Sequence, residues 1–313
     1  MSLVFQRVDA ACIPKIAPYF GQRHNRACDS TYLDTFIWSK AYQVEWAISE
    51  KTNALQFLMQ KEGAYISALP MCQDGDLKAA FEELVSYFNE VLKQPLRIAL
   101  ADQEGVEALG LLKQTDRFCL VEEVDLKDYL YDGEKMRTLS GRKLHKKKNN
   151  LNYFKKSYEG RFFYRRLSET DRDAVWKFLD RWREQKGEEV EEHLDYEIEG
   201  IHGILKSNSF YQVVMGGVFV DDVLEAFTIG SYNAREDMVV ISIEKANPDM
   251  RGLYQFINQQ YLVHEFPTAR LVNREDDLGL SGLRHAKESY CPMDYARKYR
   301  LTQIDYPGDG TSL

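Results

Sequence analysis

The chain has 313 residues, a length that predicts two domains of about 150 residues each rather than one core. Hydrophobic residues make up 44% of the sequence and aromatic residues 12%, which excludes wholesale disorder. No apolar run approaches the roughly 18 residues that a membrane-spanning helix needs, and the first residues lack a signal-peptide pattern, so we expect a cytoplasmic protein. The five cysteines form no CxxC pair, so we expect reduced thiols and no metal cluster.

The net charge of −8 conceals an uneven distribution of charge along the chain. Residues 135–166 hold twelve of the 41 Lys and Arg and one acid, Glu159, so this segment carries +11 and the remainder −19. Cations at this density attract phosphate groups, mainly through counterion release. The segment therefore predicts contact with tRNA, coenzyme phosphates or anionic lipid head groups. The alternative is a solvated helix whose lysines keep an acidic protein soluble.

The expected elements follow a similar order in the two halves of the chain. In the first half we expect strands at 4–8, 43–49, 55–60, 65–70, 97–101 and 118–124, and helices near 10–19, 30–39, 77–92 and 103–112. In the second half we expect strands at 161–166, 211–216, 224–232, 238–246, 269–273 and 294–301, and helices at 170–184, 196–206, 253–264 and 279–288. The simplest interpretation is two copies of one fold.

This order of elements resembles the Gcn5-related N-acetyltransferase superfamily. The resemblance implies an α+β fold with mixed sheets in tandem duplication, in which the sheet splays after its fourth strand and the acyl donor enters the gap. We place an N-terminal lobe at 1–130, a basic linker helix at 131–160, a C-terminal lobe with the active site at 161–306 and a flexible tail at 307–313. Fold order alone does not define a reaction.

Within the linker, residues 141–158 are expected to form a helix with one apolar face. That face consists of residues spaced by seven, three and four positions, namely Leu144, Leu151, Phe154 and Tyr158. The opposite face would present Lys143, Lys146, Lys147 and Asn150. We expect the cations here to bind the anionic groups of a donor, namely Arg142, Lys143, Lys146 and Lys147.

The segment around the fourth strand of the second half carries two further candidates. Acyltransferases of this fold bind the donor pyrophosphate at the start of the next helix, where free amides and the helix dipole favour anions. Arg251 and Gly252 would cap an anion there, unless they merely start a helix. Coenzyme A enzymes usually have two glycines in this loop, so coenzyme A is the less favoured donor. Glu244 ends the preceding strand and would take a proton from an attacking amine or hydroxyl, unless it is a salt-bridged surface residue.

Residues 272–292 form a polar cluster between a short apolar strand and the last strand. Strand-to-helix loops of an open sheet face the ligand crevice, so we expect these groups to line an acceptor cleft. They include Asn273, Arg274, Asp276 and Arg284. Tyr290 would protonate the leaving group. The alternative is a loop whose polar side chains cap the following helix.

Three segments together resemble the C-terminal domain of phosphatidylglycerol lysyltransferases, in particular stand-alone bacterial proteins with that domain. They are GRKLHKKKNNLNYFKK, IEKAN with RGLYQFIN, and VNREDDLGLSGLRHAKESYCP. The resemblance covers most of the chain and is best from Tyr129 onward. It implies a tandem acetyltransferase-like fold and transfer of a lysyl or alanyl group from tRNA to the phosphatidylglycerol head group, with no cofactor required.

The family pattern, transferred by position, implies roles for Glu244, Asn247, Gly252, Asn273 and Lys287. Two of these positions depart from it. The family has Asp where this chain has Glu244, and Arg where it has Asn247, so the charge that would hold the acceptor phosphate or the tRNA end is missing there. The sequence also contains no counterpart of the transmembrane flippase of full-length enzymes, so a lipid acceptor is not assured.

We therefore expect an acyl or aminoacyl transferase that moves an aminoacyl group from aminoacyl-tRNA to a lipid head group or to a small amine or hydroxyl acceptor. Its expected catalytic residues are Glu244, Tyr290 and Lys287, and Asn247 joins the acceptor cleft. One alternative is a coenzyme A-dependent N-acyltransferase of small molecules. Another is a non-catalytic binder of RNA or of an anionic membrane surface, acting through the basic segment.

Overall fold

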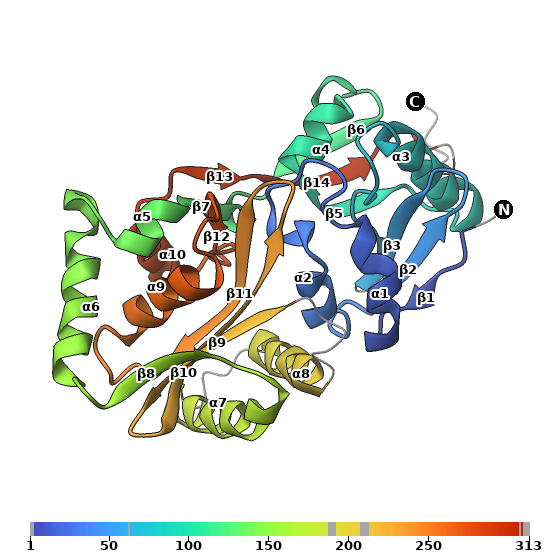
Figure 1. The fold of residues 1–313 in the computed structure, drawn as a ribbon. Helices are drawn as coiled ribbons and strands as arrows, with labels where there is room; N and C mark the ends of the chain where they lie inside the picture. Colours follow the sequence, from blue (N-terminus) through green and yellow to red (C-terminus); the bar gives the residue numbers. More distant parts are fainter. Residues whose placement is uncertain (1–2, 62, 187–191, 207–212, 307, 309–313) are drawn as a thin grey trace. The chain divides into compact units, whose positions relative to one another are not determined.

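A computed structural model describes residues 3–61, 63–186, 192–206, 213–306 and 308 (Figure 1). The chain divides into two compact units, which are residues 1–127 with 296–313, and residues 128–295. We call them unit 1 and unit 2. These bounds differ from the expected lobes at 1–130 and 161–306, because strand pairing between distant segments leaves no trace in local periodicity. The tail expected at 307–313 lies, apart from residue 308, outside the described residues.

Unit 1 contains two antiparallel sheets. One has the order β1-β2-β3-β4 and the other the order β5-β14-β6, so the last strand of the chain lies between two strands from the first half. The strands are β1 (Gln6–Arg7), β2 (Glu45–Ser49), β3 (Ala54–Lys61), β4 (Ala64–Ile66), β5 (Arg97–Asp102), β6 (Phe118–Glu122) and β14 (Lys298–Gln303). The helices are α1 (Ile13–Ile16), α2 (Tyr32–Ile37), α3 (Leu77–Ser86) and α4 (Gln103–Ala108). The side chains of Phe81, Phe118 and Leu301 meet in its core.

Unit 2 is built on one sheet with the order β13-β7-β12-β11-β10-β9-β8. The strands are β7 (Asp128–Asp132), β8 (Phe162–Arg166), β9 (Val214–Val220), β10 (Val223–Asn233), β11 (Met238–Ala246), β12 (Leu271–Asn273) and β13 (Asp294–Ala296). The helices are α5 (Gly133–Thr138), α6 (His145–Ser157), α7 (Arg172–Lys186), α8 (Glu192–Lys206), α9 (Leu253–Glu265) and α10 (Ser281–Glu288). The strand expected at 211–216 begins outside the described residues. None of the helices in the described part of the chain is long and apolar enough to cross a bilayer.

The sheet of unit 2 opens between its β11 and β12 strands. β11 pairs with β10 along its whole length, from Met238 to Ala246, but with β12 only from Met238 to Val240. β12 ends at Asn273, so beyond residue 240 β11 has no ladder partner on this side. β11 is the fourth strand in the series β8, β9, β10 and β11, after which the sequence predicts a gap in the sheet. Glu244 lies in the part of β11 that has left β12.

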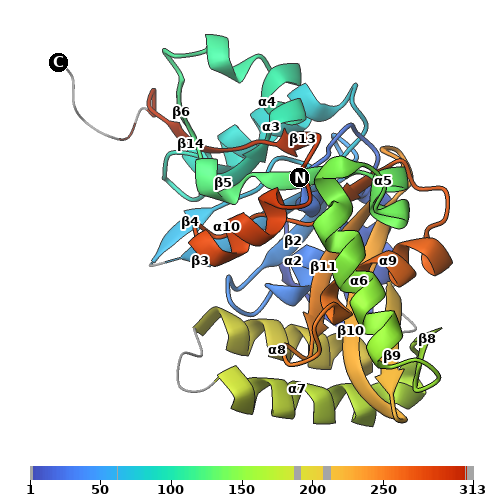
Figure 2. The same cartoon turned by 90° about the vertical axis from the view of Figure 1, so that its left-hand side faces the viewer.

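Helices cover both faces of this sheet. On one face α7 packs on β10, where the rings of Phe178 and Phe227 lie 5.5 Å apart, edge to face. On the other face α9 packs on the strands and carries α6, and the rings of Phe154 and Phe256 lie 4.9 Å apart (Figure 2). The apolar face expected for 141–158 is present, because Leu144 and Leu151 are buried with Phe154. The basic helix is thus an integral part of unit 2.

Candidate active site

The Glu244 carboxylate lies where three elements meet. Its Oε1 accepts from Nη2 of Arg274, the first residue after β12, at 2.8 Å. Its Oε2 accepts from Nδ2 of Asn258, on α9, at 2.7 Å. Only 8% of the Glu244 side chain is exposed. The opening between β11 and β12 therefore holds a buried carboxylate that is fixed from both sides.

Tyr290, which follows α10, places its ring beside this carboxylate group. Its ring lies edge to face with Tyr131 of β7, at 6.4 Å between centroids. Two cations contact the ring of Tyr290: Cζ of Arg274 lies 4.8 Å and Nζ of Lys147 lies 4.2 Å from the centroid. Burial raises the pKa of Tyr290, although nearby Arg274 opposes the shift. The phenol therefore keeps its proton at neutral pH and is available as a hydrogen-bond donor.

Lys147 does not lie on the solvent face of the basic helix as expected. It is half-buried, and its ammonium points to the Tyr290 ring. Burial lowers the pKa of Lys147, and the charge of Arg274 lowers it further. The expected spacing placed Lys147 with Lys143 and Lys146, but one residue of helix rotates a side chain by about 100°. Lys147 thus joins the Glu244 site rather than the outer surface.

Lys287 holds the loop that carries Arg274. Its Nζ donates to the main-chain oxygen of Arg274 at 2.5 Å and also to that of Asp276. Its own main-chain oxygen accepts from the hydroxyl of Tyr131 at 2.9 Å. Burial lowers the pKa of Lys287. Lys287 is therefore a positioning residue, because its ammonium donates hydrogen bonds to main-chain carbonyl oxygens.

The other polar residues of the 272–292 cluster brace the loop itself. Asn273 is fully buried, and its Nδ2 donates to Asp128 at 3.0 Å. Asp276 accepts from the amide of Leu278 at 3.0 Å. Arg284 donates to both carboxylate oxygens of Asp277 at 2.9 Å. Among the residues expected in the acceptor cleft, Arg274 reaches Glu244, whereas Asn273, Asp276 and Arg284 contact other groups of unit 2. The N-cap of α10 makes no side-chain hydrogen bond, so these contacts are not the helix capping of the alternative.

The residues expected after strand four also make contacts outside the Glu244 group. Asn247 donates to Oε2 of Glu225 at 2.9 Å. Nε of Arg251 donates to the side chain of Asn150, on α6, at 3.2 Å. Gly252 has a φ of +90°, and a Cβ there would lie 2.0 Å from the main-chain oxygen of Asn150. The glycine therefore allows the main chain of α6 to pack closely against the start of α9.

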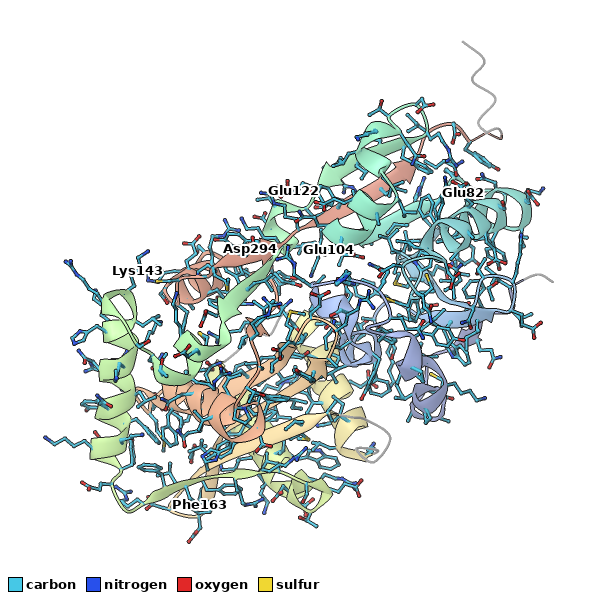
Figure 3. All side chains as sticks on the ribbon, turned by 45° about the horizontal axis from the view of Figure 1, so that its top comes forward. Glu82, Glu104, Glu122, Lys143, Phe163 and Asp294 are labelled. Carbon is cyan, nitrogen blue, oxygen red and sulfur yellow. The ribbon has the colours of Figure 1, made fainter. Side chains whose placement is uncertain are left out.

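The remaining candidate cations lie at the start of the basic helix. A shallow depression of about 580 Å³ is lined there by Leu139, Ser140, Gly141, Arg142, His145, Lys146 and Lys148. Lys143 is exposed at the same end of the helix (Figure 3). Arg142, Lys143 and Lys146 thus form a solvent-accessible basic surface, as expected from the charge pattern.

Two residues of the site, Asn258 and Tyr131, were not predicted from the sequence. Asn258 is 1% exposed and lies within the apolar stripe of α9, between Ile257 and Tyr261. A polar residue in such a stripe was a usable signal, because a buried amide needs partners. Tyr131 lies on β7, within the range expected to be linker, so its place beside Tyr290 depended on a strand pairing that periodicity does not reveal.

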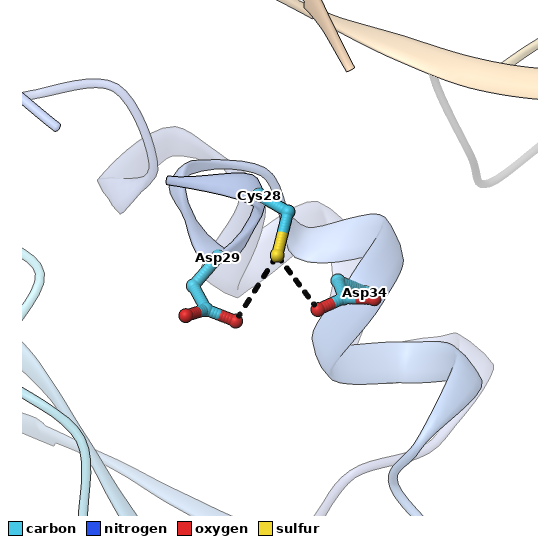
Figure 4. A group of neighbouring side chains, drawn as sticks. All are labelled: Cys28, Asp29 and Asp34. Atoms are coloured by element: carbon cyan, nitrogen blue, oxygen red, sulfur yellow. Dashed lines mark hydrogen bonds between the residues drawn. The ribbon is translucent and has the colours of Figure 1, made fainter. Parts of the chain in front are cut away.

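Unit 1 contains a separate group of side chains of the kind that bind metals. Ligand atoms of Cys28, Asp29 and Asp34 lie within 4.8 Å of one another (Figure 4). The buried ammonium of Lys298 lies 3.2 Å from Sγ of Cys28. A positive charge is thus already part of this group, which we interpret as a buried structural cluster joining the first segments of unit 1 to β14.

Unit 2 combines a mixed seven-stranded sheet with a buried carboxylate on β11, and comparison with known proteins gives the family. The chain belongs to the phosphatidylglycerol lysyltransferase C-terminal family, which matches residues 20–302. The fold predicted from the sequence, an α+β tandem of acetyltransferase-like units, is confirmed.

Several solved structures share this fold. A conserved protein of unknown function from Bacteroides thetaiotaomicron is 23% identical, with a TM-score of 0.88, covering 96% of this chain and 100% of that one. The C-terminal domain of a putative lysylphosphatidylglycerol synthetase from Agrobacterium fabrum is 14% identical, with a TM-score of 0.68, covering 96% and 94%. L-PGS from Bacillus licheniformis is 13% identical, with a TM-score of 0.67, covering 93% and 92%. In sequence, an uncharacterised protein of Mycoplasmoides gallisepticum is 27% identical over 72% of this chain and 71% of its own length.

Proposed function

We propose that this chain is an aminoacyltransferase that moves an aminoacyl group from aminoacyl-tRNA to an amine or hydroxyl, with a lipid head group as the first acceptor to test. Membership of the phosphatidylglycerol lysyltransferase C-terminal family supports the reaction class. The observation that carries the proposal is the buried Glu244 carboxylate, fixed by Arg274 and Asn258 at the point where β11 and β12 separate.

In the proposed reaction the acceptor nitrogen or oxygen attacks the ester carbonyl of the aminoacyl donor. The new C–N or C–O bond forms as the ester bond to the terminal ribose breaks. Glu244 accepts the proton of the attacking group, since two hydrogen bonds leave lone pairs on its oxygens. Tyr290 donates its proton to the leaving ribose oxygen, and the proton on Glu244 restores it through water. Most of the rate would come from positioning the two reactants.

The basic surface at the start of α6 supports a nucleic-acid donor. Arg142, Lys143 and Lys146 are exposed together and would contact backbone phosphates of the tRNA. The start of α9 is less suited to the pyrophosphate of coenzyme A, because the main-chain oxygen of Asn150 lies against Gly252. Coenzyme A thioesters are therefore the second donor to test.

The first experiment compares donors and acceptors with the purified chain. Radiolabelled lysyl-tRNA and alanyl-tRNA are supplied in one arm and acetyl-coenzyme A in the other, each with phosphatidylglycerol vesicles or with a panel of small amines. We expect acceptor-dependent release of the aminoacyl group from tRNA and no transfer from the thioester. Transfer from acetyl-coenzyme A alone would contradict the proposed donor.

The second experiment tests the carboxylate with a matched control. Glu244→Gln keeps the shape but removes the proton acceptor, so we expect turnover to fall by at least about 100-fold. Glu225→Gln changes a carboxylate of the same sheet that contacts Asn247 and Arg181 instead, and we expect turnover within about twofold of the unchanged protein. Equal losses in the two variants would argue that Glu244 has only a structural role.

A further inference from the structure

Two buried polar atoms beside the Glu244 carboxylate lack hydrogen-bond partners. Nη2 of Arg274 and Nδ2 of Asn258 bind the carboxylate, but Nη1 of Arg274 and Oδ1 of Asn258 are buried with no partner in the described part of the chain. Leaving such a group unpaired costs about 1–3 kcal/mol, so each needs a physical explanation. One unpaired donor and one unpaired acceptor, on residues that bind the two oxygens of the same carboxylate, are complementary to a polar ligand.

Lys147 brings a second cation to the same place. Its ammonium makes no hydrogen bond or ion pair with the residues that the structure describes, and its contact is the ring of Tyr290. The ring does not neutralise the charge, and Arg274 lies against the same ring. Lys147 and Arg274 together carry +2 and Glu244 carries −1, so the group has one positive charge in excess. A buried guanidinium and a half-buried ammonium that contact the same aromatic ring are suited to binding an anion.

The arrangement of the donors favours a phosphate group over a halide or a single hydroxyl. A guanidinium edge from the loop after β12 and an ammonium from α6 are suited to two oxygens of one tetrahedral anion. The neighbouring residues on α6, Lys146 and Lys148, line the solvent-accessible depression, so the helix carries positive charge from the surface to Lys147. A singly charged phosphodiester would balance the excess charge of the group.

We propose that Lys147 and Nη1 of Arg274 form a binding subsite for a phosphodiester group of the substrate, beside the Glu244 carboxylate. Oδ1 of Asn258 accepts an N–H or O–H of the same substrate. This inference rests on the proposed function, in which both substrates contain phosphodiesters, one in the head group of a lipid and one near the end of the nucleic acid. Lys147 and Arg274 thereby supply the positive charge that an Arg would supply at position 247, where this chain has Asn247.

The test is equilibrium binding of two soluble phosphodiesters to the full chain, by calorimetry at low salt. Glycerophosphoglycerol represents the lipid head group, and the trinucleotide CCA represents the nucleic-acid end. We expect one of the two to bind, and the one that binds identifies the source of the phosphodiester. In Lys147→Gln we expect its Kd to rise at least about tenfold, because a charge-assisted hydrogen bond is lost.

Two further variants control for charge and folding. Lys156→Gln removes the same charge from an exposed position near the end of α6, and we expect its Kd to stay within about twofold. Lys147→Arg keeps the charge, and we expect it to restore most of the affinity. Thermal unfolding of each variant shows whether the fold is intact. Equal binding by Lys147→Gln and the unchanged protein, or no binding of either probe, would overturn the subsite.

The outcomes also separate this inference from the proposed function. If a phosphodiester binds in a Lys147-dependent way but no aminoacyl transfer occurs with any acceptor, the subsite stands and the proposed function fails. If transfer occurs and Lys147→Gln changes neither phosphodiester binding nor the KM of either substrate, the proposed function stands and the subsite fails.

Discussion

Two buried arginine–carboxylate pairs, one in each unit, differ in how completely they are satisfied. In unit 1, Arg23 binds both oxygens of Asp102, and its remaining donors reach the main-chain oxygens of Pro70 and His24. Asp102 also caps α4 through the amide of Gly105 at 2.8 Å. Each guanidinium nitrogen of Arg23 thus has a partner.

In unit 2, Arg274 binds Glu244. Nη1 of this arginine and Oδ1 of the neighbouring Asn258, however, have no hydrogen-bond partner in the described part of the chain. Both pairs join a guanidinium to a carboxylate, so they differ in whether buried polar atoms beside the pair lack hydrogen-bond partners. A fully satisfied pair contributes to the fold, whereas a pair with unused buried groups indicates a ligand.

The largest expected change in stability comes from the satisfied pair. Asp102→Asn leaves the Arg23 guanidinium buried without its counter-charge, so we expect a loss of about 3–5 kcal/mol in the free energy of unfolding. Urea denaturation measures this loss. A decrease below about 1 kcal/mol would show that the Arg23–Asp102 pair contributes little to the stability of unit 1.

The contact of α6 with α9 holds Lys147 at the site, and the second prediction concerns the stability of this contact. Gly252→Ala places a Cβ 2.0 Å from the Asn150 oxygen at a positive φ, and we expect a loss of about 2–4 kcal/mol. Gly110→Ala in unit 1 has a φ of +63° and open space around the new Cβ, so we expect only about 1 kcal/mol. Equal losses in urea denaturation would mean that the backbone angle alone matters.

The Asp277–Arg284 pair is a satisfied pair within unit 2 and gives the smallest of the three effects. The hydrogen bonds that Asp277 accepts from Arg284 lower the pKa of Asp277 from 3.8 to about 2, because they outweigh the opposite effect of burial. A carboxyl with a lowered folded-state pKa stabilises the fold above its unfolded pKa and loses this contribution as the pH falls through the folded value. We expect Asp277→Asn to cost about 2 kcal/mol at pH 6, and the difference from the unchanged protein to shrink between about pH 4 and pH 2. A difference that stays constant over this range, in urea denaturation at each pH, would contradict the ion pair.

Local patterns in the sequence predicted the elements well and their partners poorly. The apolar stripe of 141–158 predicted α6, and the β-rich run at 238–246 predicted β11 with Glu244 near its end. The segment 294–301 was expected as one strand. It divides into β13 and β14, which join different sheets. Alternation of side chains shows that a segment is a strand, but not which distant strand it pairs with.

The same limit applies to the site. The polar cluster of 272–292 was expected to line an acceptor cleft, and in the structure its Arg274 contacts Glu244 and the ring of Tyr290. It did not distinguish Arg274 from Asn273 or Arg284, because residue type does not show which side chains of a loop face inward. Lys147 was expected on the outer face of its helix, and only the packing of α6 on α9 shows that it faces Tyr290.

The role of the Glu244 site is tested most directly by single-turnover aminoacyl transfer per folded molecule in Glu244→Gln and Asp102→Asn, with lysyl-tRNA as donor and phosphatidylglycerol vesicles as acceptor. We expect Glu244→Gln to stay folded and to transfer at least about 100-fold more slowly. We expect Asp102→Asn, once corrected for its folded fraction, to transfer within about twofold of the unchanged protein. Transfer at the unchanged rate by Glu244→Gln would contradict the assignment of this site.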